Sequence, residues 1–173
     1  MTAVPFAVAM GSNLGSREAN LLAGAAFIMG SGLVFEPSLS GMVESDPKGG
    51  VEGGAFLNCV MVGGANGSPR LMLELCRSAE SALGSRINKE GRARRLDVDL
   101  LFVGDDPVTE DDLSLPHPRM YERRFVLQPL SQVWEGPVPV LGASPADLLE
   151  KLGSGEDLRV LLDRPDPGRL WRL

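Results

Sequence analysis

Two aspartates stand two positions apart in the segment Arg94-Arg95-Leu96-Asp97-Val98-Asp99-Leu100-Leu101. In a strand, residues i and i+2 point to the same side, so Asp97 and Asp99 share a face while the apolar residues enter the core. Two carboxylates about 7 Å apart beside a buried strand are costly unless a cation neutralises them. Mg²⁺ does so with one or two carboxylates plus substrate phosphates. The alternative is a solvated edge strand whose aspartates pair with Arg94 and Arg95.

A second segment, Leu115-Pro116-His117-Pro118-Arg119-Met120-Tyr121-Glu122-Arg123-Arg124-Phe125-Val126-Leu127, holds the only histidine of the chain. Two flanking prolines restrain His117, which suits contact with a ligand but equally suits a hydrogen bond within a loop. A lone histidine forms no histidine-based metal site. Arg119 and Arg123 are four residues apart, so one helical turn would place both on one face. That face either binds phosphate or is simply a solvated, charged surface.

Two weaker patterns lie nearer the N-terminus. Phe56-Leu57-Asn58 places an aromatic ring and an amide on one strand face, where they could stack on and pair with a flat heterocycle. Gly11-Ser12-Asn13 allows close approach of a ligand between a strand and a helix, but it lacks the lysine of a Walker A loop. Alone, this turn is better explained as a tight turn with a helix cap.

Composition narrows the partners of such a site. The 173 residues carry a net charge of −6 with 14 arginines but only 3 lysines, and seven of the arginines fall between residues 86 and 124. An acidic chain with a local arginine cluster favours a small anionic ligand over nucleic acid. Two cysteines in apolar segments indicate free thiols. No long apolar run or signal peptide is evident, so we expect a cytoplasmic protein with no membrane partner, and we predict a monomer.

The elements that must position these residues follow one order. Apolar runs and turn residues predict a strand over 6–10, a helix over 16–29, a strand over 33–40, a glycine-rich loop over 41–55, a strand over 56–62, a helix from Ser68 to Gly84, an arginine-rich loop over 85–95 and a strand over 96–102. This β-α-β-β-α-β order is ferredoxin-like: an α+β fold with two helices on one face of an antiparallel sheet. A short helix is expected over 145–152, and the tail from Asp163 is left unassigned.

The four segments AMGSNLG, FLN, RRLDVDLLF and LPHPRMYERRFVLQPL, in this order over residues 6–130, resemble the 6-hydroxymethyl-7,8-dihydropterin pyrophosphokinase family of folate biosynthesis. The resemblance implies transfer of pyrophosphate from MgATP to 6-hydroxymethyl-7,8-dihydropterin, giving AMP and the pterin diphosphate. It also implies a ferredoxin-like fold and two Mg²⁺ ions. We therefore expect one domain over 1–173, with a core over about 6–130 and a C-terminal extension over 131–173.

The resemblance also assigns site residues by motif position. It implies the metal ligands Asp97 and Asp99, which with Arg94 and Arg92 form the expected catalytic set. The residues expected to bind the pterin are Asn58, Phe56, Phe125, Ser45 and Pro47. Those expected to bind ATP are Glu80, Arg86, His117, Arg123 and Ser114.

The chain departs from the family pattern in its arginine-rich loop. Gly84-Ser85-Arg86-Ile87 keeps one of the two arginines usual there, and Gly91-Arg92-Ala93-Arg94 replaces an aromatic-Gly-Pro-Arg lead into the aspartate strand. Arg92 is the candidate replacement for the missing arginine. A tyrosine usual near the second strand is Val43.

Three other functions are alternatives, and each makes a requirement that can be compared with the sequence or with an assay. An RNA-recognition module would need a basic surface and aromatic residues on its sheet, but the pI is near 4.8 and aromatic residues make up 5% of the chain. A metal-dependent nuclease would need a basic track. A family member that binds pterin without turnover would release no AMP.

Overall fold

The computed structural model describes residues 3–46, 54–84, 93–153, 155 and 158–162. The first part of the chain forms β1 (Val4–Ser12), α1 (Arg17–Met29), β2 (Val34–Leu39), β3 (Met42–Ser45), β4 (Phe56–Ala65), α2 (Pro69–Ala82) and β5 (Asp97–Val103). The second part forms β6 (Val108–Glu110), β7 (Leu113–Leu115), a 3-10 helix η1 (Met120–Glu122), α3 (Arg124–Ser131), α4 (Pro145–Leu152) and β8 (Arg159–Leu162).

The main sheet is antiparallel and has the strand order β5-β1-β4-β3-β8, with β2 also paired to β4. Strand β1 therefore has β4 on one side and β5 on the other. Strands β2 and β3 together take the place of the second strand in the β-α-β-β-α-β pattern. With that correspondence, the order is the ferredoxin-like one expected from the sequence. Strands β6 and β7 form a separate hairpin.

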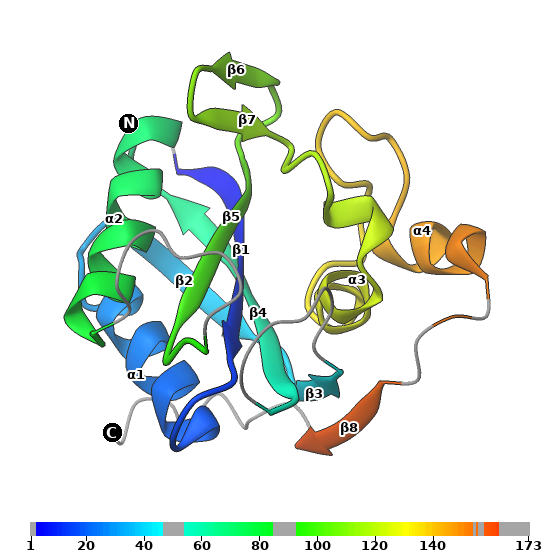
Figure 1. Cartoon of the computed structure of the whole chain (residues 1–173). Coiled ribbons are helices and arrows are strands. Elements are labelled where there is room, and N and C mark those ends of the chain that lie inside the picture. Colours follow the sequence, from blue (N-terminus) through cyan, green and yellow to red (C-terminus); the bar gives the residue numbers. More distant parts are fainter. Residues whose placement is uncertain (1–2, 47–53, 85–92, 154, 156–157, 163–173) are drawn as a thin grey trace.

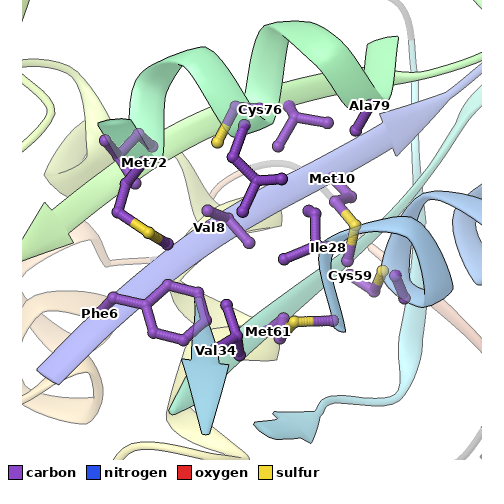
Figure 2. Close-up of a cluster of buried hydrophobic side chains, with 14 of the residues drawn as sticks. Phe6, Val8, Met10, Ile28, Val34, Cys59, Met61, Met72, Cys76 and Ala79 are labelled. Atoms are coloured by element: carbon purple, nitrogen blue, oxygen red, sulfur yellow. The ribbon is translucent and has the colours of Figure 1, made fainter. Parts of the chain in front are cut away.

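Alternate residues of the sheet supply two hydrophobic cores. One lies under α1 and α2 and contains Phe6, Val8 and Met10 of β1, all at most 1% exposed (Figure 2). The other face carries Ala7, Val60 and Phe102, which pack against α3 and the segments that follow it. Figure 1 shows α1 and α2 on one side of the sheet and α3 with α4 on the other.

The structure adds one feature to the expected fold and corrects one expectation. The expected pair of helices does lie on one face, but α3 and α4 cover part of the opposite face, which the ferredoxin-like pattern does not specify. The loop expected over 41–55 contains β3. Met42, Val43 and Ser45 are all buried, so β3 shows no alternation of apolar and polar residues, and the glycines after it favoured a loop.

Helix ends follow local chemistry. The Ser68 hydroxyl accepts a hydrogen bond from Leu71 N–H, and Pro69 occupies the first turn of α2. Ser144 and Asp147 form a reciprocal capping box at α4, which matches the predicted helix in its bounds. Ser16 stands at the N-cap of α1 but its side chain makes no capping hydrogen bond. The acidic Glu18 in the first turn interacts favourably with the positive end of the helix dipole.

Candidate active site

Small side chains on β1 leave room for a cleft on the sheet face away from α1 and α2. Gly11 lies opposite both Asn58 on β4 and Asp97 on β5, and Ala9 lies opposite Asp99. Opposed residues in an antiparallel pair point to the same face. The cleft has a volume of about 400 Å³, and β1 forms its floor between an amide-bearing wall and an acidic wall.

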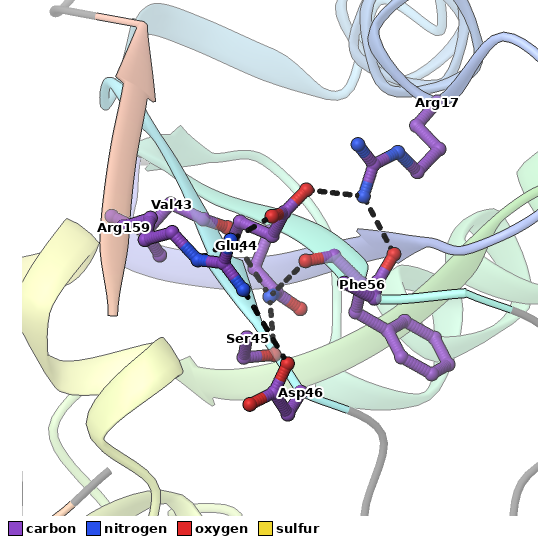
Figure 3. Close-up of polar contacts among 9 residues, drawn as sticks. Arg17, Val43, Glu44, Ser45, Asp46, Phe56 and Arg159 are labelled. Carbon is purple, nitrogen blue, oxygen red and sulfur yellow. Dashed lines mark hydrogen bonds and ion pairs between the residues drawn. The ribbon is translucent and has the colours of Figure 1, made fainter. Parts of the chain in front are cut away.

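The amide-bearing wall is made by β3, β4 and the start of α3. The Asn58 amide group donates from Nδ2 to the Ser45 hydroxyl at 3.0 Å and to the Val43 carbonyl at 3.4 Å. Asn58 is 6% exposed, so these bonds hold its side chain in one orientation. The rings of Phe56 and Phe125 also line the cleft. Figure 3 shows Ser45 and Phe56 on the neighbouring ends of β3 and β4.

The acidic wall is balanced by arginines. Arg94 pairs with Asp97, and Arg123 Nη1 lies 2.8 Å from Asp99 Oδ2. Burial, reinforced by the charge of Asp99, raises the pKa of Asp97, although Arg94 opposes the shift. Asp97 is therefore a carboxylate that gains from an added cation. The two arginines come from different parts of the chain: Arg94 precedes β5, and Arg123 directly precedes α3.

His117 lies at the edge of the acidic wall. Its Nε2 is 3.9 Å from Asp99 Oδ1, and its Nδ1 accepts a hydrogen bond from Arg119 N–H at 3.2 Å. Burial lowers the pKa of His117, although Asp99 opposes the shift. A neutral imidazole with Nδ1 as acceptor carries its proton on Nε2. His117 can thus donate a hydrogen bond to a ligand without adding a formal charge.

A second cavity, of about 330 Å³, adjoins the cleft and shares Asp99 with it. Its polar and apolar lining comes from α2, β5, the β6–β7 hairpin and the following loop. The lining residues are Leu73, Val98, Asp99, Leu100, Asp111, Asp112, Leu113, Ser114, His117 and Pro118. Ser114 and His117, both assigned to ATP from the sequence, therefore meet in one place.

Glu80 supports the acidic wall from behind. Its Oε1 accepts a hydrogen bond of 2.8 Å from the Val98 N–H, the peptide group between the two aspartates. Burial raises the pKa of Glu80 to about 7, although this hydrogen bond opposes the shift. Glu80 lines neither cavity, so its described contact is with the strand rather than with the ligand space.

The raised pKa of Glu80 predicts a loss of stability as pH rises. The unfolded carboxyl ionises first, so stability is fully present below the unfolded pKa and declines as pH rises through the folded pKa of about 7. Glu80→Gln keeps an acceptor for Val98 but does not ionise. As pH rises from about 5 to about 8.5, we expect the free energy of unfolding of this variant to increase by about 1–2 kcal/mol relative to that of wild type. Urea unfolding at both pH values measures this. Glu74→Gln, on the exposed face of α2, is the control and should gain nothing; an equal gain there would contradict the assignment.

The structure brings most of the predicted site residues together. The cleft is lined by Asp97, Asp99, Arg94, Arg123, Asn58, Phe56, Phe125 and Ser45. Pro47, Arg86 and Arg92 lie outside the described residues. The cleft lining also includes Asp46 and Arg119. The sequence analysis assigned no role to Asp46; its position directly after Ser45 was the signal that could have identified it. Arg119 was considered there only as one of a pair of possible phosphate ligands.

The two carboxylates fit a metal ion delivered with a phosphate substrate. Among the residues described, no group of three or more His, Cys, Asp or Glu side chains is arranged to hold a metal by itself. Asp97 and Asp99 nevertheless project from one strand into the cleft, and Mg²⁺ commonly takes one or two carboxylates plus substrate phosphates. The donor set therefore suits Mg²⁺ rather than a metal that requires a closed protein cage.

Residues 7–135 match the family model of 7,8-dihydro-6-hydroxymethylpterin-pyrophosphokinase (HPPK). The chain belongs to this family. An HPPK relative from Bacillus subtilis, named 2-amino-4-hydroxy-6-hydroxymethyldihydropteridine pyrophosphokinase, is 34% identical over 73% of this chain and 75% of its own length. A relative of the same name from Mycobacterium bovis is 37% identical over 70% of this chain and 68% of its own length.

Solved HPPK structures share the fold. A Plasmodium falciparum HPPK-DHPS chain superposes with a TM-score of 0.67 at 12% identity, covering 87% of this chain and 45% of that one. The present chain thus spans less than half of these HPPK-DHPS proteins. It also spans 19% of the Folic acid synthesis protein FOL1 of Dictyostelium discoideum, to which it is 33% identical over 73% of its own length. No helix in the described parts of this HPPK chain is long and apolar enough to cross a membrane.

The floor of the HPPK cleft yields a prediction at Gly11. A Cβ there would lie 3.2 Å from Asn58 Oδ1 and 3.5 Å from Phe56 Cδ1. We expect Gly11→Ala to crowd the amide-bearing wall and weaken pterin binding about tenfold, the cost of one poorly accommodated methyl group. Gly136→Ala, where the nearest atom is 3.9 Å away, should leave binding unchanged. Isothermal titration with the pterin measures both; unchanged affinity in Gly11→Ala would place the pterin elsewhere.

Proposed function

We propose that the cleft carries out the family reaction on this chain. The chain is an ATP-dependent pyrophosphokinase of folate synthesis, which transfers pyrophosphate from ATP to 6-hydroxymethyl-7,8-dihydropterin. The pterin hydroxyl oxygen forms a bond to the β-phosphorus, the bond between that phosphorus and the α,β-bridging oxygen breaks, and AMP leaves. The hydroxyl proton is released. Such a transfer depends mainly on positioning and charge stabilisation, which this site can supply without a covalent intermediate.

One observation carries the assignment of this cleft. Gly11 lies between Asn58 and Asp97 in the sheet register, with no side chain of its own to fill the space between them. A flat heterocycle held by Asn58, between Phe56 and Phe125, would therefore extend over Gly11 toward the carboxylates. In this arrangement the pterin and the phosphates approach each other from opposite walls of a single cleft.

We assign Asp97 and Asp99 as the ligands of Mg²⁺, with two ions expected from the family resemblance. Magnesium when bound neutralises phosphate charge and holds the attacking and leaving oxygens in line. Arg94 and Arg123, paired with the aspartates in this structure, are positioned to contact phosphate oxygens through their forked donors. Ser114 and His117 are assigned to the nucleotide in the second cavity. Arg92, Arg86 and Pro47 keep the roles expected from the sequence.

A product assay tests this function. The protein is mixed with MgATP and 6-hydroxymethyl-7,8-dihydropterin, and AMP is separated from ADP. We expect AMP and pterin diphosphate in equal amounts, and no AMP when the pterin is omitted. ADP as the product would contradict pyrophosphoryl transfer. Bound pterin without AMP would instead favour the binding-only protein.

Three further predictions concern the whole molecule. We propose a single domain over residues 1–173, because α4 packs on α3 and β8 extends the main sheet. We also propose that the protein is a monomer, which light scattering coupled to gel filtration will test. The proposed location is the cytoplasm, where ATP and free thiols such as Cys59 and Cys76 are maintained.

A further inference from the structure

Arg17 joins three parts of the fold on the side of the sheet away from the cleft. It is the first residue of α1, and its Nη1 lies 2.7 Å from Glu44 Oε2 on β3 and 2.6 Å from the Ala55 carbonyl oxygen just before β4. Figure 3 shows the Arg17 guanidinium directed toward Glu44, with its two contacts drawn as dashed lines. Arg17 does not line the cleft, so its effect on a ligand there must pass through other residues.

Both acceptors are direct neighbours of cleft residues. Glu44 precedes Ser45, and Ala55 precedes Phe56. Ser45 and Phe56 lie opposite each other in the β3–β4 register and point into the cleft. Because successive residues of a strand point to opposite faces, a contact on the back of this strand pair sets the placement of the residues on its front.

The contact is stronger than an ordinary surface ion pair. The Glu44 side chain is 12% exposed and that of Arg17 is 30% exposed, so solvent screens the pair less than it would at an open surface. The second arginine near Glu44, Arg159 of β8, stands 3.8 Å away and is 68% exposed. Arg17 is therefore the principal counter-ion of a largely buried carboxylate.

We propose that Arg17 is a positioning residue for pterin binding, because it fixes the ends of β3 and β4 that present Ser45, Phe56 and, through Ser45, Asn58. The inference rests on the proposed function of the cleft and extends it to a residue on the opposite face of the sheet. The acidic wall has its own supports in Arg94, Arg123 and Glu80. Loss of Arg17 should thus weaken pterin binding much more than ATP binding.

The test compares Arg17→Ala, Arg17→Lys and Glu44→Gln with wild type. Equilibrium dialysis measures pterin binding with a non-hydrolysable ATP analogue present, and steady-state assays give KM for each substrate. We expect Arg17→Ala to raise the pterin Kd and KM about tenfold, the scale of one lost charge-assisted hydrogen bond, with the KM for ATP changed less than about twofold. Lysine at position 17 should restore most of the affinity, since a single nitrogen makes both contacts. Glu44→Gln, which keeps an acceptor, should raise the pterin KM about threefold.

Lys151→Ala, which removes an exposed cation from α4, is the control and should change neither constant. Unchanged pterin affinity in Arg17→Ala would overturn the inference. So would equal losses for pterin and ATP, or a failure of lysine to restore binding. If Arg17→Ala does not fold, Arg17→Lys and Glu44→Gln decide the question by the same ratio of pterin to ATP effects. A wild-type protein that binds pterin but releases no AMP contradicts the proposed function, whereas the pterin Kd values of the variants, measured by dialysis, still decide the role of Arg17.

Discussion

Asp97→Asn should lower kcat by a factor on the order of 10²–10³, the cost of removing one main electrostatic contact to a transition state. Asparagine keeps the shape of the side chain and an acceptor for Arg94, but it removes the charge that would hold Mg²⁺ with Asp99. The binding of pterin to Asn58 and the phenylalanines should change little, because those groups lie on the other wall. Steady-state AMP production at saturating substrates measures the effect.

The same substitution should not weaken the fold. The pKa of Asp97 is raised by burial and by Asp99, so the ionised carboxylate costs stability as pH rises above its unfolded pKa. A neutral amide removes that cost, and the midpoint of thermal unfolding at about pH 8 should equal or exceed that of wild type. Asp105→Asn, at an exposed position, is the matched control and should retain full activity. An active Asp97→Asn enzyme would rule out the metal assignment.

Asn58→Ala should weaken pterin binding by about 10–100-fold, since a site built to pair with polar atoms loses one to two hydrogen bonds of about 1.5 kcal/mol each. It should also reduce the free energy of unfolding by about 1–3 kcal/mol, because the Ser45 hydroxyl and the Val43 carbonyl lose a buried donor. ATP binding should remain within about twofold, because the phosphate-side arginines are untouched.

Titration calorimetry with pterin and with an ATP analogue measures the effects of Asn58→Ala on the two affinities. Urea unfolding measures its effect on the free energy of unfolding. Asn66→Ala, at an exposed position, controls for loss of an amide elsewhere. Equal losses of pterin and nucleotide affinity would indicate a general disturbance of the fold and would remove Asn58 from the pterin site.

The side-chain directions that the sequence predicted correctly belong to strands with clear alternation. Leu96, Val98 and Leu100 enter the core as expected, which places Asp97 and Asp99 in the cleft. The same period of two put Phe56 and Asn58 on one face. These predictions succeeded because residue spacing within one strand fixes side-chain direction without reference to the rest of the chain.

The parts that the sequence missed depend on contacts between distant segments. Strand β3 is buried on both faces, so neither its pattern nor its glycine-rich surroundings marked it as a strand. β8 pairs with β3 from more than a hundred residues away, and no local signal specifies that pairing. The contact of Arg17 with Glu44 is equally non-local. An arginine at the start of a helix and a glutamate in an expected loop give no indication that they meet.

The pairing of β8 with β3 gives the C-terminal segment a protective role in the sheet. Without β8, the outer edge of β3 would present unpaired backbone groups that another chain could use as a template for strand addition. Strand β8 therefore covers an edge that lies next to the amide-bearing wall of the cleft. A protein shortened before Arg159 would lose the contact between Arg159 and Glu44 and would expose the outer edge of β3. We expect such a protein to self-associate through β3.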